Sequence, residues 1–599
     1  MESKVSEGYS IPASSGGTGQ APNQQELGGT GQAPNQQELG GTGQAPNQQE
    51  LGGTGQAPNQ QELGGTGQVP NQQELGGTGQ VPNQQETVLG ALELTRKPRR
   101  GDVMTVELDA LSLRGLGLRR VTWQPQPQGL RVFARREMEL EVRLALPGER
   151  VRIEVMHVEK HRAEARVLDF ERRSALRRSP RCKHFEPAEG RGCGGCSLQS
   201  VLYEDQLGLK RETLRQALAS RGLEIPLEAL LSARHEWNYR NKMEYSFGHT
   251  LDGRPGLGLH PVGSRNRVIE LEECYLQSAF SAALVVAIRD WMRALAIEPY
   301  HHRRNTGFGR TLTVREGKQT GERLVLLTSA SQPMVQTSEG MWEAQRVAES
   351  FTQRVLSLAT ELGERVDGIC WRQQILQTGV ATRFETCCLW GSPVLHERLE
   401  LSDGSALRFE VGPASFFQTN TLHAQVLYST VIQCVTQGQA RVGRVFDLYC
   451  GTGSIGLCLA RHAERVIGIE LDREAVRSAQ ANAEYNGIEN VTFLCGDVGR
   501  VLREQGERAS GVGDVVVVDP PRSGLGRVAL EQVIALGAPR LIYVSCNPFS
   551  MAKELSVLQE RYELEKVRGV DMFPQTGHVE AVASLRLRAV DGERESIPQ

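Results

Sequence analysis

The feature that most constrains the fold is an alternation of apolar strands and amphipathic helices over residues 408–599. The apolar stretches are, in order, RVFDLYC, RVIGIEL, VTFLC, DVVVVDPP, LIYVSC and EAVASLRLR. Parallel strands need crossover connections, and helices between strands supply them. The pattern therefore predicts an α/β domain with an open parallel sheet and helices on both faces.

The first 91 residues have a different character. From Gly16 the unit GGTGQAPNQQEL recurs every 12 residues in six copies. A unit this polar buries too little to offset the entropy of ordering, so we predict a disordered tail over residues 1–91. A solenoid is the alternative, but so short and polar a repeat has no core to stack.

Two segments lie between the tail and the α/β region. Residues 92–170 alternate apolar and charged positions, broken by Gly and Pro, which is typical of a small β-barrel. Residues 171–407 mix helices and strands, which predicts an α+β central domain. Residues 95–183 carry 22 Lys and Arg against 12 Asp and Glu, an excess that fits a polyanionic partner or, equally, a solvated basic face.

Composition indicates the cellular location of the protein. The chain is 39% hydrophobic and 23% charged, and no apolar run approaches the roughly 18 residues that span a bilayer. The N-terminus MESKVSEGYS lacks the basic and apolar segments of a secretory leader. We therefore expect a cytoplasmic protein with no membrane contact, whose twelve cysteines are thiols, metal ligands or catalysts rather than disulfides.

A candidate ligand site begins at VFDLYCGTGSIG, residues 445–456, which runs from a strand through a glycine-rich turn into a helix. Gly451 and Gly453 let a ligand approach the backbone, and the helix offers its first amides. Glu470 ends the next strand about 20 residues later, where a carboxylate can bind both hydroxyls of a ribose. Asp497 follows the third strand and is expected on the adenine side.

This set resembles the S-adenosylmethionine site of Rossmann-like methyltransferases. The resemblance implies a Rossmann-like fold for residues 408–599 and S-adenosylmethionine as the methyl donor. The cofactor-binding residues that it implies are Gln418, Tyr449, Gly451, Gly453, Ser454, Glu470, Asp497 and Asp519.

Four motifs in sequence order narrow the chemistry: DLYCGTG, DPPRSG, VSCNP and TGHVE. They resemble the RNA (uracil-C5)-methyltransferase family, whose members make 5-methyluridine. Because C5 of uracil is too weak a nucleophile to take a methyl group directly, a thiolate first adds to C6. The resemblance implies Cys546 as that nucleophile and Glu580 as the base that removes the C5 proton. In isolation, Cys546 would be interpreted as a core thiol and Glu580 as a surface carboxylate.

Several expectations follow for the surroundings of Cys546. If the last strand runs antiparallel to its neighbours, Glu580 and Cys546 share one crevice. The helix that begins in NPFSMAKEL is expected to lower the thiol pKa through its amides and dipole. His578 is expected to be structural or to help position the base. In SFFQTN, residues 415–420, one phenylalanine is expected near the target base, although FF alone would predict core.

A second candidate site consists of the cysteines Cys182, Cys193, Cys196 and Cys274. CxxC with two further cysteines suits zinc or an iron-sulfur cluster, and spacing alone does not decide between them. A subset of the uracil-C5 family holds a 4Fe-4S cluster on C-x5-C-G-G-C, whereas here the first gap has ten residues, as after an insertion. The resemblance still implies a 4Fe-4S cluster at these four cysteines. Cys387 and Cys388 are predicted to be buried thiols.

The family resemblance covers residues 95–590. The stretch LPGERV resembles the TRAM domain, which implies RNA binding by residues 92–170. Residues 171–407 are assigned the cluster segment and a central RNA-binding domain. In HEWNYRNKMEYSFG, Arg240 and Lys242 are candidates for RNA contact, and a charged strand edge is the alternative.

The predicted activity is methylation of C5 of a uridine in RNA. We expect 23S ribosomal RNA as the substrate, because the transfer-RNA branch of the family typically lacks both the TRAM domain and the cluster. A monomer without an obligate protein partner is expected. The alternatives are a transfer-RNA uridine-C5 methyltransferase, a non-catalytic RNA-binding iron-sulfur protein on the same scaffold, and an amine or cytosine methyltransferase.

Overall fold

The computed structural model describes residues 91–125, 134–185, 192–262, 264, 266–376, 379–505 and 514–589. The chain divides into two units, Met1–Gln85 and Glu86–Gln599, and every described element belongs to the second. The predicted disordered tail, except for residue 91, lies outside the described residues. None of the described helices combines the length and apolar character that crossing a bilayer requires.

The first sheet has seven strands in the order β1-β4-β5-β7-β6-β2, with β3 paired to β4. Its strands are β1 (Leu92–Leu94), β2 (Val103–Glu107), β3 (Ala110–Leu111), β4 (Gly117–Trp123), β5 (Arg136–Arg143), β6 (Arg150–Val158) and β7 (Arg162–Arg172). In β6, Val151, Ile153 and Val155 are buried while Arg152 between them is exposed. This alternation puts one face of the strand on the core and the other in solvent.

Along the sequence, helix α1 (Tyr203–Ala219) lies between the strands of the first sheet and those of the second. The second sheet has the order β10-β9-β8-β11-β12-β15-β16, and its core includes residues of α2 (Ala279–Ala294) and α3 (Ala344–Leu362). Its strands are β8 (Lys242–His249), β9 (Pro255–Leu259), β10 (Ile269–Glu270), β11 (Gly309–Glu316), β12 (Arg323–Ala330), β15 (Gly368–Ile375) and β16 (Arg383–Gly391). Two hairpins complete this part of the chain: β13 (Met334–Thr337) with β14 (Gly340–Glu343), and β17 (Leu395–Glu400) with β18 (Ala406–Val411).

The prediction that Cys387 and Cys388 are buried is wrong. Both lie on β16, and both are exposed. Strand β16 is the last strand of its sheet, and nearly all its residues are exposed. An edge strand can carry apolar-looking residues without cover on either face, which its local sequence does not reveal.

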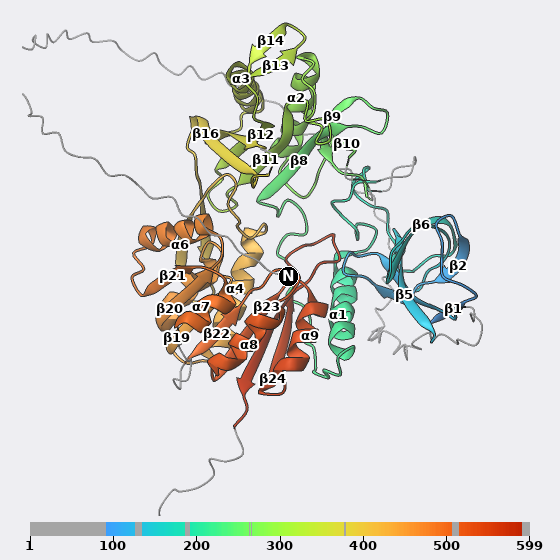
Figure 1. Cartoon of the computed structure of the whole chain (residues 1–599), viewed down its shortest axis with the longest axis vertical. Helices are drawn as coiled ribbons and strands as arrows, with labels where there is room; N and C mark the ends of the chain where they lie inside the picture. The colour runs from blue at the N-terminus through green and yellow to red at the C-terminus, as the bar shows by residue number, and fades with distance from the viewer. Residues whose placement is uncertain are drawn as a thin grey trace, which may run out of the picture. The chain divides into compact units, whose positions relative to one another are not determined.

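The third sheet carries the predicted α/β alternation. Its strands are β19 (Val442–Leu448), β20 (Ala463–Glu470), β21 (Val491–Cys495), β22 (Val515–Val518), β23 (Arg540–Ser545), β24 (Tyr562–Val570) and β25 (Glu580–Leu587). Its helices are α4 (Thr421–Thr436), α5 (Ser454–Leu459), the 3-10 helix η1 (Ala460–His462), α6 (Arg473–Tyr485), α7 (Val498–Gln505), α8 (Gly526–Leu536) and α9 (Pro548–Leu558). Figure 1 shows these elements in orange to red.

The order of this sheet is β21-β20-β19-β22-β23-β25-β24. Strands β19 to β23 are parallel, whereas β25 runs antiparallel to both β23 and β24. The predicted Rossmann-like fold and its antiparallel last strand are therefore confirmed. The strand order reverses direction at β19, and in such sheets ligands bind beyond the carboxyl ends of the strands at this point.

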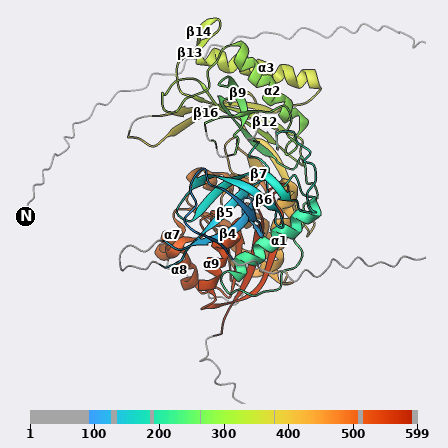
Figure 2. The same cartoon turned by 90° about the vertical axis from the view of Figure 1, so that its right-hand side faces the viewer.

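Helices cover both faces of the third sheet. In β22, Val515 and Val517 belong to a core that includes α4, whereas Val516 and Val518 belong to a core that includes α8 and α9. The sequence of a strand that is buried on both faces is typically a continuous apolar run, and the sequence of β22 is VVVV. Helix α1, although distant in sequence, packs against α9 (Figure 2).

Candidate active site and cysteine pocket

The glycine-rich turn between β19 and α5 contains three residues in the left-handed region. Tyr449, Gly451 and Gly453 have φ values of 65°, 55° and 78°. A Cβ on Gly453 would lie 2.7 Å from Cζ of Phe493 and 2.9 Å from Cβ of Ala479, so no side chain fits there. A Cβ on Gly451 would meet nothing within 4 Å, which leaves open space beside the turn.

Three carboxylates stand at the carboxyl ends of the parallel strands β20, β21 and β22. At the end of β20, Glu470 accepts hydrogen bonds from the backbone N–H of Gly451 at 3.0 Å and of Asp472 at 2.9 Å. Asp497 follows β21 and accepts a hydrogen bond from the first turn of α7. Asp519 follows β22, and burial raises its pKa to about 6. The turn and these acids form one edge, as the sequence predicts.

The remaining predicted cofactor residues lie in the segments that flank this edge. The backbone carbonyl of Gln418 accepts a hydrogen bond from the Asn241 side chain at 2.7 Å. The hydroxyl of Tyr449 donates to the carbonyl of Leu525 at 3.3 Å. Ser454 is the first residue of α5 and contacts the buried Tyr428.

Cys546 follows the last residue of β23, and Glu580 is the first residue of β25. Ser545, the last residue of β23, is paired with Ala581 of the antiparallel β25. One residue further along each strand, Cys546 and Glu580 therefore emerge side by side at the carboxyl edge. Cys546 is half-buried, and burial, followed by the charge of Glu580, raises the pKa of its thiol. The structure brings the two predicted residues together.

The net shift of the Cys546 thiol pKa is upward, opposite to the lowering expected from the helix that follows it. Helix α9 begins at Pro548 as predicted, but the Asn547 side chain caps it by accepting hydrogen bonds from the amides of Phe549 and Ser550. Burial, followed by the charge of Glu580, raises the Cys546 pKa above its ordinary value. The first amides of α9 are thus already engaged, and desolvation disfavours the thiolate.

Arg522 is a functional candidate that the sequence did not place near Cys546. It follows β22 in the DPPR motif, and its positive charge opposes the rise of the thiol pKa. Its backbone carbonyl accepts hydrogen bonds from the side chains of Asn547 and Ser550, which fixes it at the start of α9. Its guanidinium lies 3.2 Å from Nδ1 of His578. The only sequence signal was that a cation beside a cysteine favours its thiolate, and the 23 residues between Arg522 and Cys546 gave no indication that the two are close in space.

Glu580 has an unusual protonation state for a carboxyl group. Its side chain is 5% exposed. Burial, together with the negative charge of Asp519, raises its pKa to about 8, while Arg522 acts in the opposite direction. His578 next to it has a pKa lowered to about 4, because burial and the Arg522 charge disfavour the imidazolium. At neutral pH the free protein therefore holds a protonated Glu580 and a neutral His578.

The two phenylalanines of SFFQTN have different environments. Phe417 is 3% exposed and packs against Phe409, with ring centroids 5.6 Å apart. Phe416 is 66% exposed, and its carbonyl accepts a hydrogen bond from Thr452 in the glycine-rich turn. Phe417 is therefore a core residue, and Phe416 is the ring free to contact a ligand beside the turn.

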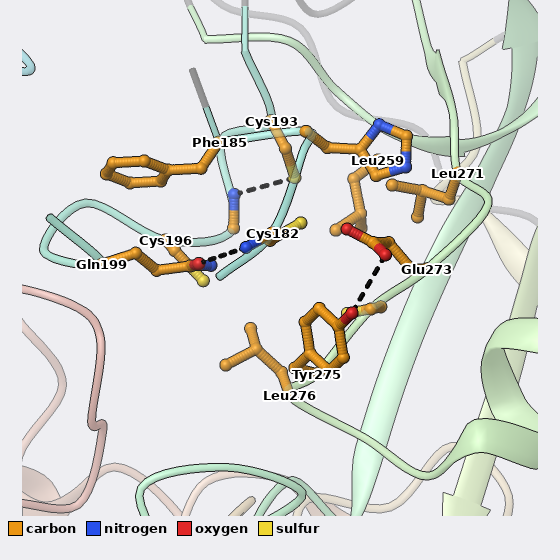
Figure 3. A pocket seen from close by; sticks show the side chains of 13 residues that line it. Cys182, Phe185, Cys193, Cys196, Gln199, Leu259, Leu271, Glu273, Tyr275 and Leu276 are labelled. Atoms are coloured by element: carbon orange, nitrogen blue, oxygen red, sulfur yellow. Dashed lines mark hydrogen bonds between the residues drawn. The ribbon is translucent and has the colours of Figure 1, made fainter. Parts of the chain in front are cut away.

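The four predicted metal-ligating cysteines line one cavity (Figure 3). Cys182, Cys193 and Cys196 come from the segment before α1, and Cys274 from the segment after β10. The cavity wall also includes the apolar side chains of Phe185, Leu259, Leu271 and Leu276. Burial raises the pKa of Cys182 to about 11 and of Cys193 to about 12.

The cavity does not have the arrangement of a preformed single-ion site. Among the described residues, no three His, Cys, Asp or Glu side chains are placed to hold one metal ion. The four thiols surround a space instead of meeting at a point. The residues that would accompany the predicted insertion, 186–191, lie outside the described residues.

Arg240 and Lys242, predicted to contact RNA, have different positions. Arg240 is half-buried beside Tyr239; burial raises the pKa of the Cys196 and Cys274 thiols, and the charge of Arg240 acts in the opposite direction. It therefore lies beside the cysteine cavity. Lys242 begins β8, opposite Arg315 of β11, and burial lowers its pKa.

Comparisons with known proteins agree with this geometry. A family model described as tRNA (Uracil-5-)-methyltransferase matches residues 370–588. An RNA methyltransferase of Protochlamydia amoebophila is 36% identical over 75% of this chain and 100% of its own length. An RNA methyltransferase of Caldanaerobacter subterraneus is 34% identical over 81% of this chain and 99% of its own length. The chain belongs to the RNA (uracil-C5)-methyltransferase family.

The methyltransferase also resembles a solved structure of this kind. The tRNA (uracil-54, C5)-methyltransferase of Pyrococcus abyssi, solved in complex with S-adenosyl-L-homocysteine, is 25% identical with a TM-score of 0.57. The likeness covers 80% of this chain and 99% of that one. The part that matches the family model, residues 370–588, contains Gln418, the glycine-rich turn, Cys546 and Glu580.

Proposed function

We propose that this methyltransferase transfers the methyl group of S-adenosylmethionine to C5 of a uridine in 23S ribosomal RNA. Cys546 is the nucleophile and Glu580 the general base. The observation that carries the proposal is the emergence of these two residues side by side at the carboxyl edge of the third sheet, beyond the Ser545–Ala581 pair. The family of the chain and the likeness to a uracil-C5 enzyme support it.

The reaction begins when the Cys546 thiol releases its proton to solvent and becomes a thiolate. Its sulfur bonds to C6 of the uracil, and the electrons of the C5–C6 double bond move toward C5 and the C4 carbonyl. C5 then forms a bond to the methyl carbon of S-adenosylmethionine, and S-adenosylhomocysteine leaves. Arg522 supports the thiolate, since its charge lowers the thiol pKa against the effects of burial and Glu580.

The second half of the reaction needs a base. After methyl transfer, C5 carries both the methyl group and its original hydrogen. Glu580, which first releases its own proton to solvent, takes the C5 proton as a carboxylate; the C5–H electrons restore the C5–C6 double bond, and the C6–S bond breaks to release the Cys546 thiolate. A carboxyl whose pKa is raised to about 8 is a stronger base than an exposed one, which suits removal of a carbon-bound proton.

The open space beside Gly451 supports the location of the cofactor. We assign Glu470 to the ribose hydroxyls, Asp497 to the adenine side, and Gln418, Tyr449, Gly453, Ser454 and Asp519 to the remaining contacts. Glu470 fits this role because the amides of Gly451 and Asp472 already orient its carboxylate. Phe416, exposed beside the same turn, is positioned to stack on the extruded uracil.

We assign RNA docking to the TRAM-like residues 92–170 and to the central domain, residues 171–407. The basic excess over residues 95–183 supports this assignment because phosphates dominate RNA affinity. The preference for 23S ribosomal RNA over transfer RNA rests on the TRAM-like segment and the four cysteines. The enzyme is proposed to act as a cytoplasmic monomer.

We propose that Cys182, Cys193, Cys196 and Cys274 hold a 4Fe-4S cluster. A tetrahedral zinc site brings its four sulfurs to about 2.3 Å from one centre, whereas a cubane needs space between its ligands. The cavity that the four thiols line together with several apolar side chains supports the larger group. The cluster is not needed for methyl transfer, and we assign it a structural role.

The activity is tested by incubating the protein with methyl-labelled S-adenosylmethionine and either ribosomal or transfer RNA, then mapping the labelled nucleotide. Label at C5 of one uridine in 23S RNA is expected. Label in transfer RNA alone identifies the alternative substrate, and label on an amine or cytosine refutes the uracil chemistry.

Cys546→Ala is expected to abolish labelling, and Cys388→Ala, on the exposed edge strand, to retain it. Full methylation by Cys546→Ala would contradict the proposal. A wild-type protein that binds RNA without labelling it would support the non-catalytic alternative.

The cluster is tested by anaerobic purification followed by measurement of iron, acid-labile sulfide and zinc per chain. About four irons and four sulfides per chain are expected. Cys193→Ser should lower both, whereas Cys387→Ser should leave them unchanged. Stoichiometric zinc without sulfide would refute the assignment.

A further inference from the structure

The loop that leads to Glu580 is held by a part of the chain far away in sequence. Residues 571–579 connect β24 to β25, and we call them the base loop. Among the described residues, none donates a hydrogen bond to the Glu580 carboxyl, and its pKa responds only to burial and to the charges of Asp519 and Arg522. The position of its oxygens therefore depends on where the backbone of the base loop places the start of β25.

Gln575 is the centre of the contacts that hold the base loop. It has φ of 67°, a left-handed conformation that a residue with a side chain seldom adopts without support. Its N–H donates to Oε1 of Gln206 at 2.9 Å, and its Oε1 accepts from Nε2 of Gln206 at 3.0 Å. Its Nε2 donates to Glu236 at 2.9 Å. Gln206, on α1, is fully buried.

The segment that follows Cys196 holds the same loop from a second side. The carbonyl of Gln575 accepts hydrogen bonds from the N–H groups of Ser197 at 2.9 Å and Leu198 at 3.1 Å. The hydroxyl of Ser197 accepts one from the Gly577 N–H at 3.2 Å. A Cβ on Gly577 would lie 2.2 Å from the backbone nitrogen of Gly115, so the loop is closely packed there.

Further contacts reach the first half of the base loop. Lys210, one turn after Gln206 on α1, forms a buried ion pair with Asp571 at 2.6 Å and donates to the carbonyl of Phe573 at 3.0 Å. The hydroxyl of Tyr239 donates to the carbonyl of Pro574 at 3.0 Å. Each turn of the loop is thus fixed by residues outside the third sheet.

We propose that Gln206 and Ser197 are positioning residues that hold Glu580 in place for proton removal, acting through Gln575 and Gly577. This inference rests on the proposed function and goes beyond it. Loss of this positioning should affect one step of the reaction, the removal of the C5 proton. A displaced Glu580 slows removal of the C5 proton, and therefore breakage of the C6–S bond, but leaves attack by Cys546 and methyl transfer intact. The methylated covalent protein–RNA adduct should then accumulate.

The test uses the full chain and a 23S RNA substrate. Gln206→Met keeps the volume of the side chain but removes its two hydrogen bonds with Gln575 and its two with the carbonyls of Leu198 and Val201. A roughly 10-fold to 100-fold lower kcat is expected for a small displacement of the base, with little change in KM for S-adenosylmethionine. The decisive readout is the fraction of protein in a denaturation-resistant RNA adduct, which should rise. Gln216→Met, half-buried on the same helix, is the matched control.

The outcomes separate the inference from the proposed function. If wild-type protein makes no 5-methyluridine, the proposed function fails. If wild type is active but Gln206→Met lowers turnover without more adduct, or leaves turnover unchanged, the positioning role is refuted. If Gln206→Met does not fold, the test uses Ser197→Ala, because this variant removes only the hydroxyl that holds Gly577. Ser197→Ala is expected to raise the adduct fraction by a smaller factor. An unchanged adduct fraction overturns the inference.

Discussion

Cys546 and Glu580 lie one residue beyond the Ser545–Ala581 pair, at the ends of two antiparallel strands of an otherwise largely parallel sheet. If β25 ran parallel to β23, the start of β25 would lie at the opposite edge and the thiol and the carboxyl would be separated by the length of the strand. The reversal of this last strand therefore assembles the site. It also buries the carboxyl, which is why the pKa of Glu580 is raised to about 8.

Glu580→Gln is expected to trap the covalent adduct. The amide fills the same space but accepts no proton from C5, so the reaction stops after methyl transfer with the C6–S bond intact. A band of protein linked to RNA should persist in denaturing gels, and it should carry the methyl label. The exposed Glu560→Gln is the control. Release of free 5-methyluridine RNA by Glu580→Gln at the wild-type rate would exclude Glu580 as the base.

The same substitution is expected to stabilise the fold at neutral pH. Between the ordinary carboxyl pKa of 4.5 and the raised value of about 8, the folded chain retains a proton on Glu580 that the unfolded chain has released, so stability falls as pH rises through this window. Since Gln resembles the protonated carboxyl, Glu580→Gln should gain on the order of 3 kcal/mol at pH 7.

This gain should shrink toward zero as pH falls below 4.5, where the folded and the unfolded wild type both carry the proton on Glu580. Urea unfolding of both proteins at several pH values measures it. A gain that is constant with pH would mean that the carboxyl is not the source.

The two glycines of the turn should respond differently to alanine. Gly453→Ala forces a Cβ against Phe493 and Ala479 as well as a left-handed φ, and the overpacking alone costs about 1–3 kcal/mol. Gly451→Ala meets no atom, so only the left-handed backbone cost of about 1 kcal/mol applies.

Urea midpoints measure the difference in stability between the two variants. Calorimetric titration with S-adenosylmethionine should show weaker binding by Gly451→Ala, because its methyl group enters the open space beside the turn. Equal stability losses for the two variants would argue against the tight contact at Gly453.

Arg522→Met is expected to make Cys546 less reactive. Loss of the guanidinium removes the charge that opposes the effects of burial and Glu580, so the thiol pKa should rise further. Iodoacetamide labelling of Cys546, followed by peptide mass spectrometry across pH, reports this shift. Arg527→Met, exposed on α8, should have no effect. An unchanged labelling profile for Arg522→Met would show that the guanidinium does not act on the thiol.

Local sequence was sufficient for some parts of the site. The glycine-rich turn, Glu470 and the strand that ends at Cys546 lie where periodicity and motif spacing predict, because each depends on residues within a few positions of one another. The effect of helix α9 on the pKa of the Cys546 thiol was not predictable from local sequence. Its N-terminus is where the sequence places it, yet Asn547 caps the amides that were expected to act on the thiol.

What the sequence by itself determined is the order of strands and helices, the Rossmann-like fold and the residue types of the reaction, since binary pattern and motif are properties of neighbouring positions. Only the tertiary structure decided which phenylalanine is exposed and that Cys387 and Cys388 on β16 are uncovered. It also decided that Arg522 lies beside Cys546, and that Gln206 forms a hydrogen bond with Gln575, 369 positions away in the sequence. The physical reason is that burial, charge and hydrogen bonding depend on distance in space, and folding brings together groups whose separation along the chain carries no periodic signal.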